Sequence, residues 1–327
     1  MDERFTSIIY LIKDARTNAI KAVNAELINL YWNVGEYIHK QIETNQWGTS
    51  IVEELAKYIA KQEPDLRGFS DKNLWRMKQF YETYINFPKL SPLVREISWT
   101  NNLVIIARAK SQEEREFYLN ICKQEKYSKR ELERQISASL FERTMLDKVN
   151  VSPVVREKHP GLMDSFKDSY VFDFLNLNLN HNEGELQKGL LKQMKSFILE
   201  LGKDFIFIGE EYKVEVGNSD FYIDLLFYHR GLQCLVAFEL KATKFKPEHL
   251  GQLNFYLEAL DRDVKKENEN PSIGVLLCKD KDNEVVEYAM SRNMSPTLVS
   301  EYKTQLPDKK ILQKRLHELF VMNENMD

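Results

Sequence analysis

The chain has 327 residues, of which 43% are hydrophobic and 29% charged, with a mean hydropathy of −0.47 and a formal net charge of −4. This length and composition are typical of a soluble protein of two domains and exclude a disordered chain. The acidic balance excludes a surface that is basic throughout, so binding to nucleic acid would have to come from local patches.

The sequence carries no feature of secretion or membrane insertion. It does not open with a basic segment followed by a long apolar one, and no apolar run approaches the roughly 18 residues of a membrane helix. Three cysteines, Cys122, Cys234 and Cys278, lie far apart without a CxxC motif. This pattern argues against disulfides and structural zinc, so we expect a cytoplasmic protein without membrane contact.

Residues 1–145 are predicted to form an all-α domain. Apolar residues recur at helical spacing without an internal proline in three segments: 15–43, 49–62 and 70–84. Gly35, inside the first of these, is expected to be a mild cost to the helix. Three serines are suited to cap helices that follow them: Ser70, Ser111 and Ser128.

The helix pair expected around RGFS, 50–63 and 70–85, resembles a helix-turn-helix. Lys72, Arg76 and Lys78 lie on the second helix, and the first two share a face. This face could be a recognition helix in a DNA major groove. The same pattern is typical of the solvated side of a helix whose apolar side packs inward, so the region could bind DNA, bind a partner, or do neither.

A proline-containing segment, 146–170, is predicted to be a linker. After it, one helix is expected at 184–202, followed by short apolar runs that alternate with helical segments. The apolar runs predicted as strands are 205–209, 212–216, 220–229, 232–241, 272–278 and 297–303. We therefore expect residues 171–327 to form an α/β domain with a mixed central sheet flanked by helices on both faces.

Three charged residues interrupt the most apolar pair of these strands, which reads DFYIDLLFYHRGLQCLVAFELK over residues 220–241. A two-residue turn at Arg230-Gly231 would place Asp224 opposite Ala237. Because side chains alternate along a strand, Asp224, Glu239 and Lys241 would then share one face. Phe221 and Ile223 would fill the other face, and the turn residue His229 is expected on the surface.

Two carboxylates on one face can share a divalent cation. Oxygen ligands without imidazole or thiolate suit Mg²⁺ or Mn²⁺, and Lys241 could hold a water or a phosphate. The tripeptide Glu-x-Lys alone carries little information, since it recurs at Glu211/Lys213 and Glu301/Lys303. A surface ion pair between Asp224 and Lys241 is the alternative. The apolar flanks argue against it, because they indicate central strands, where burying charged groups costs free energy.

These motifs resemble the PD-(D/E)XK nuclease superfamily: Asp224 on one strand, Glu-x-Lys on the next, and a following helix with Gln252 and Tyr256 like a QxxxY element. The phrases FKPEHLGQLNFYLEALD and LLCKDKDNEVVEYA resemble the bacterial YhcG-like nucleases, as do YWNVGEYI and GFSDKNLWRMKQFY in the first half. Such proteins join a helical domain to a C-terminal nuclease domain. The first motif residue, Asp224, lacks a preceding proline.

The resemblance implies a restriction-endonuclease-like fold and a set of site residues. Asp224, Glu239 and the main-chain carbonyl of Leu240 would bind the metal, and Lys241 would orient the attacking water. Glu185 would be the acidic residue of the first helix, although a first-turn glutamate that favours the helix N-terminus has the same pattern. Other residues expected at the site or at the DNA backbone are Gln252, Tyr256, Lys244 and Lys246.

The sequence therefore predicts a metal-dependent DNA endonuclease that acts in defence against foreign DNA or in recombination and repair. It needs no organic cofactor. A non-catalytic DNA-binding or assembly protein that acts through its helical domain is the alternative. Homo-oligomers are compatible with the sequence but are not determined by it.

Overall fold

The computed structural model describes residues 3–44, 48–146, 150–153, 165–178 and 180–324. The chain forms two compact units, Met1–Ile136 and Ser137–Asp327. No helix within the described part of the chain is long and apolar enough to cross a membrane.

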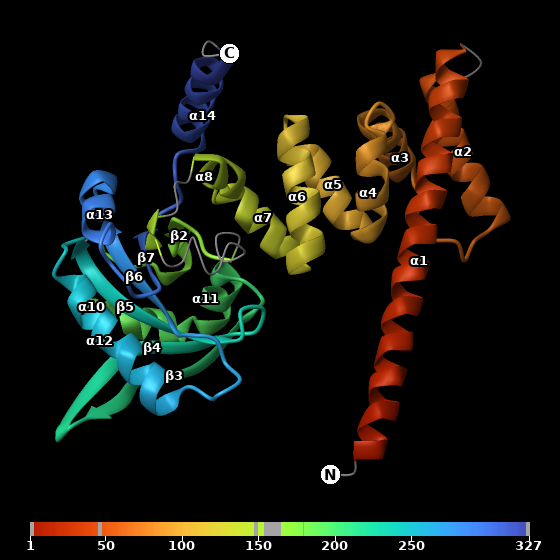
Figure 1. The fold of residues 1–327 in the computed structure, drawn as a ribbon. Helices are drawn as coiled ribbons and strands as arrows, with labels where there is room; N and C mark the ends of the chain where they lie inside the picture. The colour runs from red at the N-terminus through yellow and green to blue at the C-terminus, as the bar shows by residue number, and fades with distance from the viewer. Residues whose placement is uncertain (1–2, 45–47, 147–149, 154–164, 179, 325–327) are drawn as a thin grey trace. The chain divides into compact units, whose positions relative to one another are not determined.

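The first unit is all α-helical, as predicted (Figure 1). Its helices are α1 (Glu3–Glu43), α2 (Thr49–Gln62), α3 (Asp71–Tyr84), α4 (Ser91–Glu96), α5 (Trp99–Arg108), α6 (Gln112–Glu125) and α7 (Lys129–Ser137), which ends at the boundary. The predicted serine caps are present: Ser70, Ser111 and Ser128 each accept a hydrogen bond from the main-chain N–H three residues on.

Helices α1 and α3 cross at Gly35. A Cβ added to Gly35 would lie 2.1 Å from the main-chain oxygen of Met77. The sequence prediction considered only the cost of this glycine to its helix and missed that the close crossing leaves no room for a side chain. Tyr31 and Ile38 of α1 pack with Leu74 and Met77 of α3 in the core of this unit.

The basic residues of α3 have different environments. Lys72 and Arg76 are exposed on one face. Lys78 is half-buried, forms an ion pair with Glu82, and lies 5.9 Å from the ring centroid of Trp75. Residues 63–70 separate α2 from α3, which is longer than the turn of three or four residues in a helix-turn-helix.

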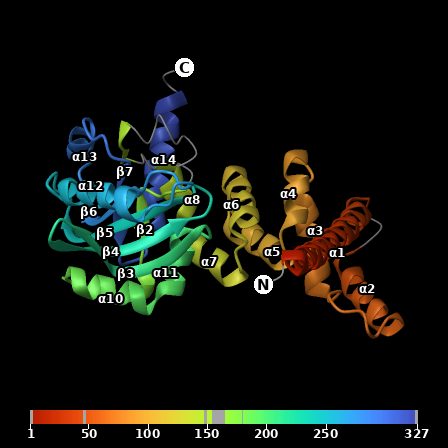
Figure 2. The ribbon, with the colours of Figure 1, turned by 60° about the horizontal axis from the view of Figure 1, so that its bottom comes forward.

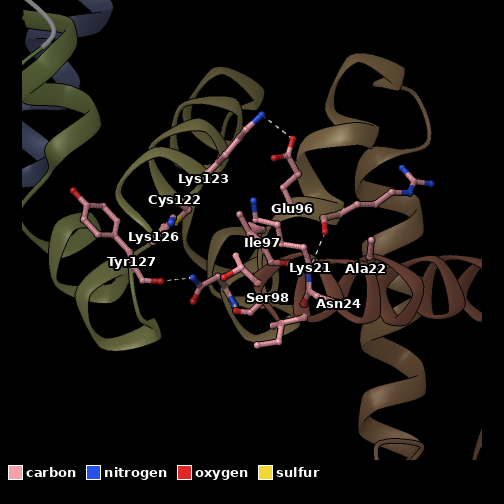
Figure 3. Close-up of a pocket in the computed structure, with 15 residues that line it drawn as sticks. Lys21, Ala22, Asn24, Glu96, Ile97, Ser98, Cys122, Lys123, Lys126 and Tyr127 are labelled. Atoms are coloured by element: carbon pink, nitrogen blue, oxygen red, sulfur yellow. Dashed lines mark hydrogen bonds and ion pairs between the residues drawn. The ribbon is translucent and has the colours of Figure 1, made fainter. Parts of the chain in front are cut away.

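Helices α1, α4, α5 and α6 border a pocket of about 740 Å³ (Figure 3). Asn24 donates hydrogen bonds of 3.0 Å to the main-chain oxygens of Arg95 and Ile97, and Asn101 donates one of 2.8 Å to that of Tyr127. These two asparagine side chains therefore fasten neighbouring elements to one another around the pocket.

The second unit is a mixed seven-stranded sheet with helices on both faces, as predicted (Figure 2). Its strands are β1 (Asn150–Val151), β2 (Ser169–Val171), β3 (Phe205–Val216), β4 (Ser219–His229), β5 (Cys234–Lys244), β6 (Ile273–Asp280) and β7 (Thr297–Lys303). Its helices are α8 (Leu140–Leu146), α10 (Glu183–Lys192), α11 (Met194–Leu201), α12 (His249–Ala259), α13 (Asn283–Met290) and α14 (Lys309–Glu324).

The strand order is β1-β7-β6-β5-β4-β3, with β2 also paired to β7. Strands β3, β4 and β5 are antiparallel, whereas β5, β6 and β7 run parallel. The segment expected as a linker is partly built into this sheet, because β1 and the start of β2 fall within residues 146–170 and pair with β7.

Each face of the sheet has its own core. On one face, α10 and α11 pack through Leu190 and Phe197 against Phe227 and Phe238. On the other face, α12 and α13 pack against Leu226, Ala237 and Leu276. The predicted single helix at 184–202 is interrupted at Gln193 (φ −110°, ψ 30°), and the two shorter helices both turn apolar residues into the first core.

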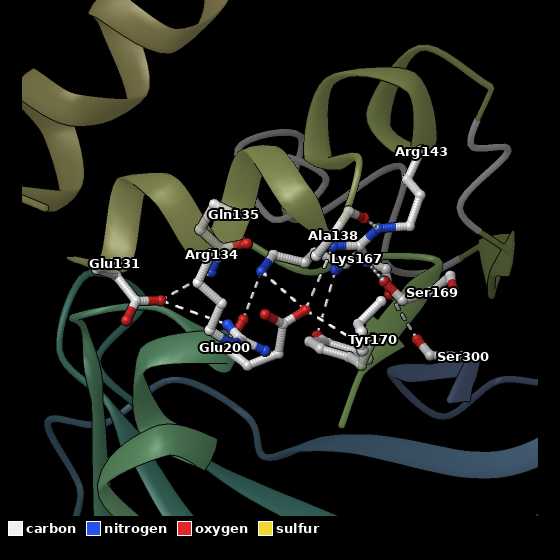
Figure 4. Close-up of polar contacts among 11 residues, drawn as sticks. Glu131, Arg134, Gln135, Ala138, Arg143, Lys167, Ser169, Tyr170, Glu200 and Ser300 are labelled. Atoms are coloured by element: carbon white, nitrogen blue, oxygen red, sulfur yellow. Dashed lines mark hydrogen bonds and ion pairs between the residues drawn. The ribbon is translucent and has the colours of Figure 1, made fainter. Parts of the chain in front are cut away.

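A buried ion cluster fastens α11 to the start of this unit (Figure 4). Glu200 is fully buried, with Arg143 and Lys167 each 3.5 Å from its Oε1. The main-chain N–H of Val171 donates to the same oxygen at 3.1 Å. Burial of this carboxylate is therefore compensated by two cations and a main-chain donor.

Candidate active site

The hairpin of β4 and β5 places the charged residues, but its register differs from the predicted one. His229 pairs with Cys234 and Leu226 with Ala237, so residues 230–233 form the connection. The predicted two-residue turn is wrong, and Asp224 lies two residues further along β5 than expected. A shift of two leaves the paired residues of β4, 225–229, on their predicted faces, because strand side chains alternate with period two.

The longer connection is explained by His229, which is buried rather than on the surface as expected. Its ring lies 5.9 Å from that of Phe166 and 4.7 Å from that of Phe205. The main-chain N–H of Leu232 donates to His229 Nδ1 at 3.1 Å. His229 thus closes the turn, and burial lowers its pKa, which keeps the ring neutral.

Where the main-chain pairing of β4 and β5 ends, the side chain of Asp224 continues the contact between the two strands. The last paired residue of β4 is Leu225, and beyond it the N–H of Leu240 donates to Asp224 Oδ2 at 2.7 Å. Burial raises the pKa of Asp224, although the hydrogen bond from Leu240 opposes this.

The predicted alternation also breaks at Asp224. Ile223 lies in the same core as Leu226, and Phe221 packs against that core, 4.6 Å from Phe255 of α12. Glu211, in the strand next to this point, has φ +41°, so the neighbouring strand is distorted here. The expected placement of Phe221 and Ile223 on the other face is therefore wrong.

Glu239 is the most buried charge of the site. It is 2% exposed, and its Oε2 has no hydrogen-bond partner. Burial, followed by repulsion from Asp224, raises its pKa to about 7. A buried carboxylate oxygen without a donor is costly, and a cation beside it would remove that cost.

Lys241 joins this carboxylate to helix α10. Its Nζ lies 2.9 Å from Glu239 Oε1 and 3.6 Å from Glu183 Oε2. Burial alone would lower the pKa of Lys241, but the hydrogen bond to Glu239 and the surrounding carboxylates raise it. Lys241 is therefore held as a cation with its ammonium group between two acidic side chains.

Helix α10 approaches the site through residues that the sequence prediction missed. Glu183 contacts Lys241, and Gln187, one turn later, donates to the main-chain oxygen of Asp224 at 3.2 Å. Glu185 instead completes a capping box. Its side chain accepts a hydrogen bond of 2.9 Å from the main-chain N–H of Asn182, and the side chain of Asn182 accepts one from the main-chain N–H of Glu185. The Asn-x-x-Glu spacing is a capping signal, and it could have indicated this role for Glu185.

Gln252 and Tyr256 form one stripe on α12, with Gln252 Nε2 2.8 Å from the Tyr256 hydroxyl oxygen. Tyr256 is buried, and burial raises its pKa. The nearby charges of Glu239 and Asp224 also contribute to this shift. The stripe therefore lies within electrostatic reach of the two carboxylates.

The two lysines expected at the DNA backbone, Lys244 and Lys246, are both exposed. Lys244 ends β5, opposite Asp280 of β6, and Lys246 lies 3.5 Å from Glu248.

The oxygen donors at this site fit a hard divalent cation. Asp224 lies close enough to Glu239 for its charge to raise the pKa of Glu239, and Oε2 of Glu239 has no hydrogen-bond partner, so it is available as a metal ligand. Within the described ranges, no group of three or more His, Cys, Asp or Glu side chains is arranged to hold a metal ion. Two carboxylates with a main-chain carbonyl such as that of Leu240 would be such a cation's protein ligands.

Comparison with known proteins covers both units. Residues 163–317 match the family model described as the YhcG PDDEXK nuclease domain, and residues 7–143 match the DUF1016 N-terminal domain. A curated protein of Escherichia coli (strain K12), named "Putative nuclease YhcG", is 31% identical over 351 residues, which covers 94% of this chain and 92% of that protein.

Among solved structures, a repair endonuclease from Pyrococcus abyssi has 17% identity and a TM-score of 0.28, covering 40% of this chain and 50% of that one. The EndoMS–dsDNA2 complex has 18% identity and a TM-score of 0.27, covering 41% and 48%. The identity, the coverage and the order of the two family domains come from the sequence comparison. By these, the chain belongs to the YhcG family of nucleases, with a DUF1016 N-terminal domain before a PDDEXK nuclease domain.

Proposed function

We propose that this protein is an endonuclease that hydrolyses DNA with Mg²⁺ or Mn²⁺. The observation that carries the proposal is Glu239, a buried carboxylate with an unpartnered oxygen beside a second carboxylate, Asp224. These two side chains and the carbonyl of Leu240 would hold the metal. When bound, the ion would lower the pKa of a water and neutralise charge on the scissile phosphate.

The protein's own groups supply positioning. Lys241, charged and held between Glu239 and Glu183, is placed to donate a hydrogen bond to the attacking water or to a phosphate oxygen. Tyr256 and Gln252 would border the same site, and Lys244 and Lys246 would contact the DNA backbone. Because Asp224, Glu239 and Glu183 together outweigh Lys241, the site repels DNA unless a cation is present, so we expect binding there to depend on the metal.

The test is cleavage of supercoiled plasmid and of labelled oligonucleotides with Mg²⁺, with Mn²⁺ and with EDTA. Glu239→Ala and Lys241→Ala should abolish cleavage. The chain offers a matched control in Glu301 and Lys303 of β7, a second Glu-x-Lys whose ion pair is also 2.9 Å long. Glu301→Ala and Lys303→Ala should cleave like the wild type. Cleavage that persists in the Glu239 and Lys241 variants would refute the proposal.

A DNA-binding role of the helical unit is a separate expectation, favoured by the exposed pair Lys72 and Arg76. If these residues contact phosphates, replacing both by glutamate should weaken DNA binding and flatten its salt dependence, with EDTA present to exclude the nuclease site. Cleavage of a panel of linear, flap, junction and modified DNA would then separate a role in repair from one in defence.

A further inference from the structure

Apolar residues follow a broad face of helix α1, and the core of its unit covers mainly the C-terminal part of that face. Ile28, Tyr31 and Ile38 are buried. Toward the N-terminus this face continues as a stripe of large apolar residues open to solvent, each 38% to 70% exposed: Ile9, Ile12, Ile20, Val23, Leu27 and Leu30. A run of this kind on one helix is larger than the scattered apolar residues of ordinary surfaces, and it indicates an interface.

The spacing of this stripe indicates that a helix covers it. Ile20, Val23, Leu27 and Leu30 follow one another at intervals of three, four and three residues, the pattern of a coiled-coil seam. Arg16, which is exposed, lies on the same face between Ile12 and Ile20. The stripe therefore consists of two apolar stretches separated by one cation.

We propose that this stripe is the interface of a homodimer in which α1 of two copies pairs antiparallel. With the two-fold axis at position 21, Ile12 lies opposite Leu30 of the second copy, and Arg16 lies opposite Glu26 of the second copy. Glu26 is exposed and borders the stripe between Val23 and Leu30. The only charge within the seam thus meets the opposite charge, and it does so twice because the contact is symmetric.

The stripe has about 800 Å² in total on the two copies, which is at the lower limit for such a dimer. From Ile9 to Leu30 it extends over about 30 Å, and exposed Phe5 and Ile8 lengthen it toward the N-terminus. A strip about 40 Å long and about 10 Å wide on each copy approaches the roughly 1,000 Å² in total that a specific interface needs. Nucleic acid does not suit this stripe, because the stripe is apolar and carries a single cation.

The experiment measures the mass of the full-length protein in solution by light scattering and sedimentation at micromolar concentration. The wild type should have twice the 38.6 kDa chain mass. Arg16→Glu and Glu26→Arg should each weaken the dimer, by about tenfold or more, because each places like charges together at two symmetric sites. The double variant should restore it, since the exchanged charges face each other again.

Two further variants exclude trivial outcomes. Val23→Glu, at a position 70% exposed, should give a monomer whose helical circular dichroism is unchanged. Lys21→Glu, on the same helix but off the stripe, should remain a dimer. A monomeric wild type, or a dimer that tolerates Val23→Glu, would overturn the proposal, including the case in which a different protein covers the stripe. A double variant that stays weakened would overturn the antiparallel pairing.

Discussion

Replacement of Glu239 by glutamine should change how stability depends on pH. The pKa of Glu239 is about 7 in the folded protein against 4.5 for an ordinary glutamate. Because the pKa is higher in the folded state, the contribution of Glu239 to the unfolding free energy is complete below about pH 4.5. It declines as the pH rises from about 4.5 to about 7, because in this range the side chain has lost its proton in the unfolded chain but still holds it in the folded one. A difference of this size corresponds to at most about 3 kcal/mol of unfolding free energy.

Glutamine does not titrate, so this decline should be absent from Glu239→Gln. Relative to the wild type in EDTA, we expect the variant to gain up to about 3 kcal/mol between pH 5 and pH 8, with most of the change below pH 7. Cleavage should be lost at the same time, and Mg²⁺ should stabilise the wild type but not the variant. This result would show that the buried charge of Glu239 lowers the unfolding free energy and is needed for metal binding.

Urea denaturation measures this gain, and the chain contains an internal control. All four tryptophans, Trp32, Trp47, Trp75 and Trp99, belong to the first unit. Their fluorescence should therefore report an unfolding transition that Glu239→Gln leaves unchanged, while far-ultraviolet circular dichroism also reports the nuclease unit. Parallel pH profiles of wild type and variant between about pH 5 and pH 8 would refute the reasoning.

Other substitutions test packing and positioning. Gly35→Ala should lower the stability of the first unit by about 1–3 kcal/mol in tryptophan fluorescence, because its Cβ would overlap Met77; an unchanged midpoint would contradict this. Arg143→Met should cost about 3 kcal/mol in the nuclease unit, because it leaves buried Glu200 with one cation fewer; a cost below about 1 kcal/mol would argue against the cluster. Tyr256→Phe should change stability by no more than about 1.5 kcal/mol yet reduce cleavage at least about tenfold; unreduced cleavage would remove Tyr256 from the site.

Local patterns in the sequence determined much of this protein. Helical spacing and serine caps predicted α2, α3, most of α1 and the starts of α6 and α7, and short apolar runs predicted the strands β3 to β7. Helices α4 and α5 and the short strands β1 and β2 were not predicted. Glu239 and Lys241 contact each other on β5, as their spacing of two predicts, whereas the alternation of β4 breaks at Asp224. The features that were predicted depend only on neighbours a few residues apart, which is why the sequence alone reveals them.

Tertiary packing decided the rest. Gly35 is favoured at its position only because α3 crosses α1 there, and His229 is buried by rings from two other elements. Glu183 rather than Glu185 reached Lys241 because the capping box had already engaged Glu185. These contacts join segments far apart in the chain, and their geometry depends on loop lengths and helix crossings that local periodicity does not encode.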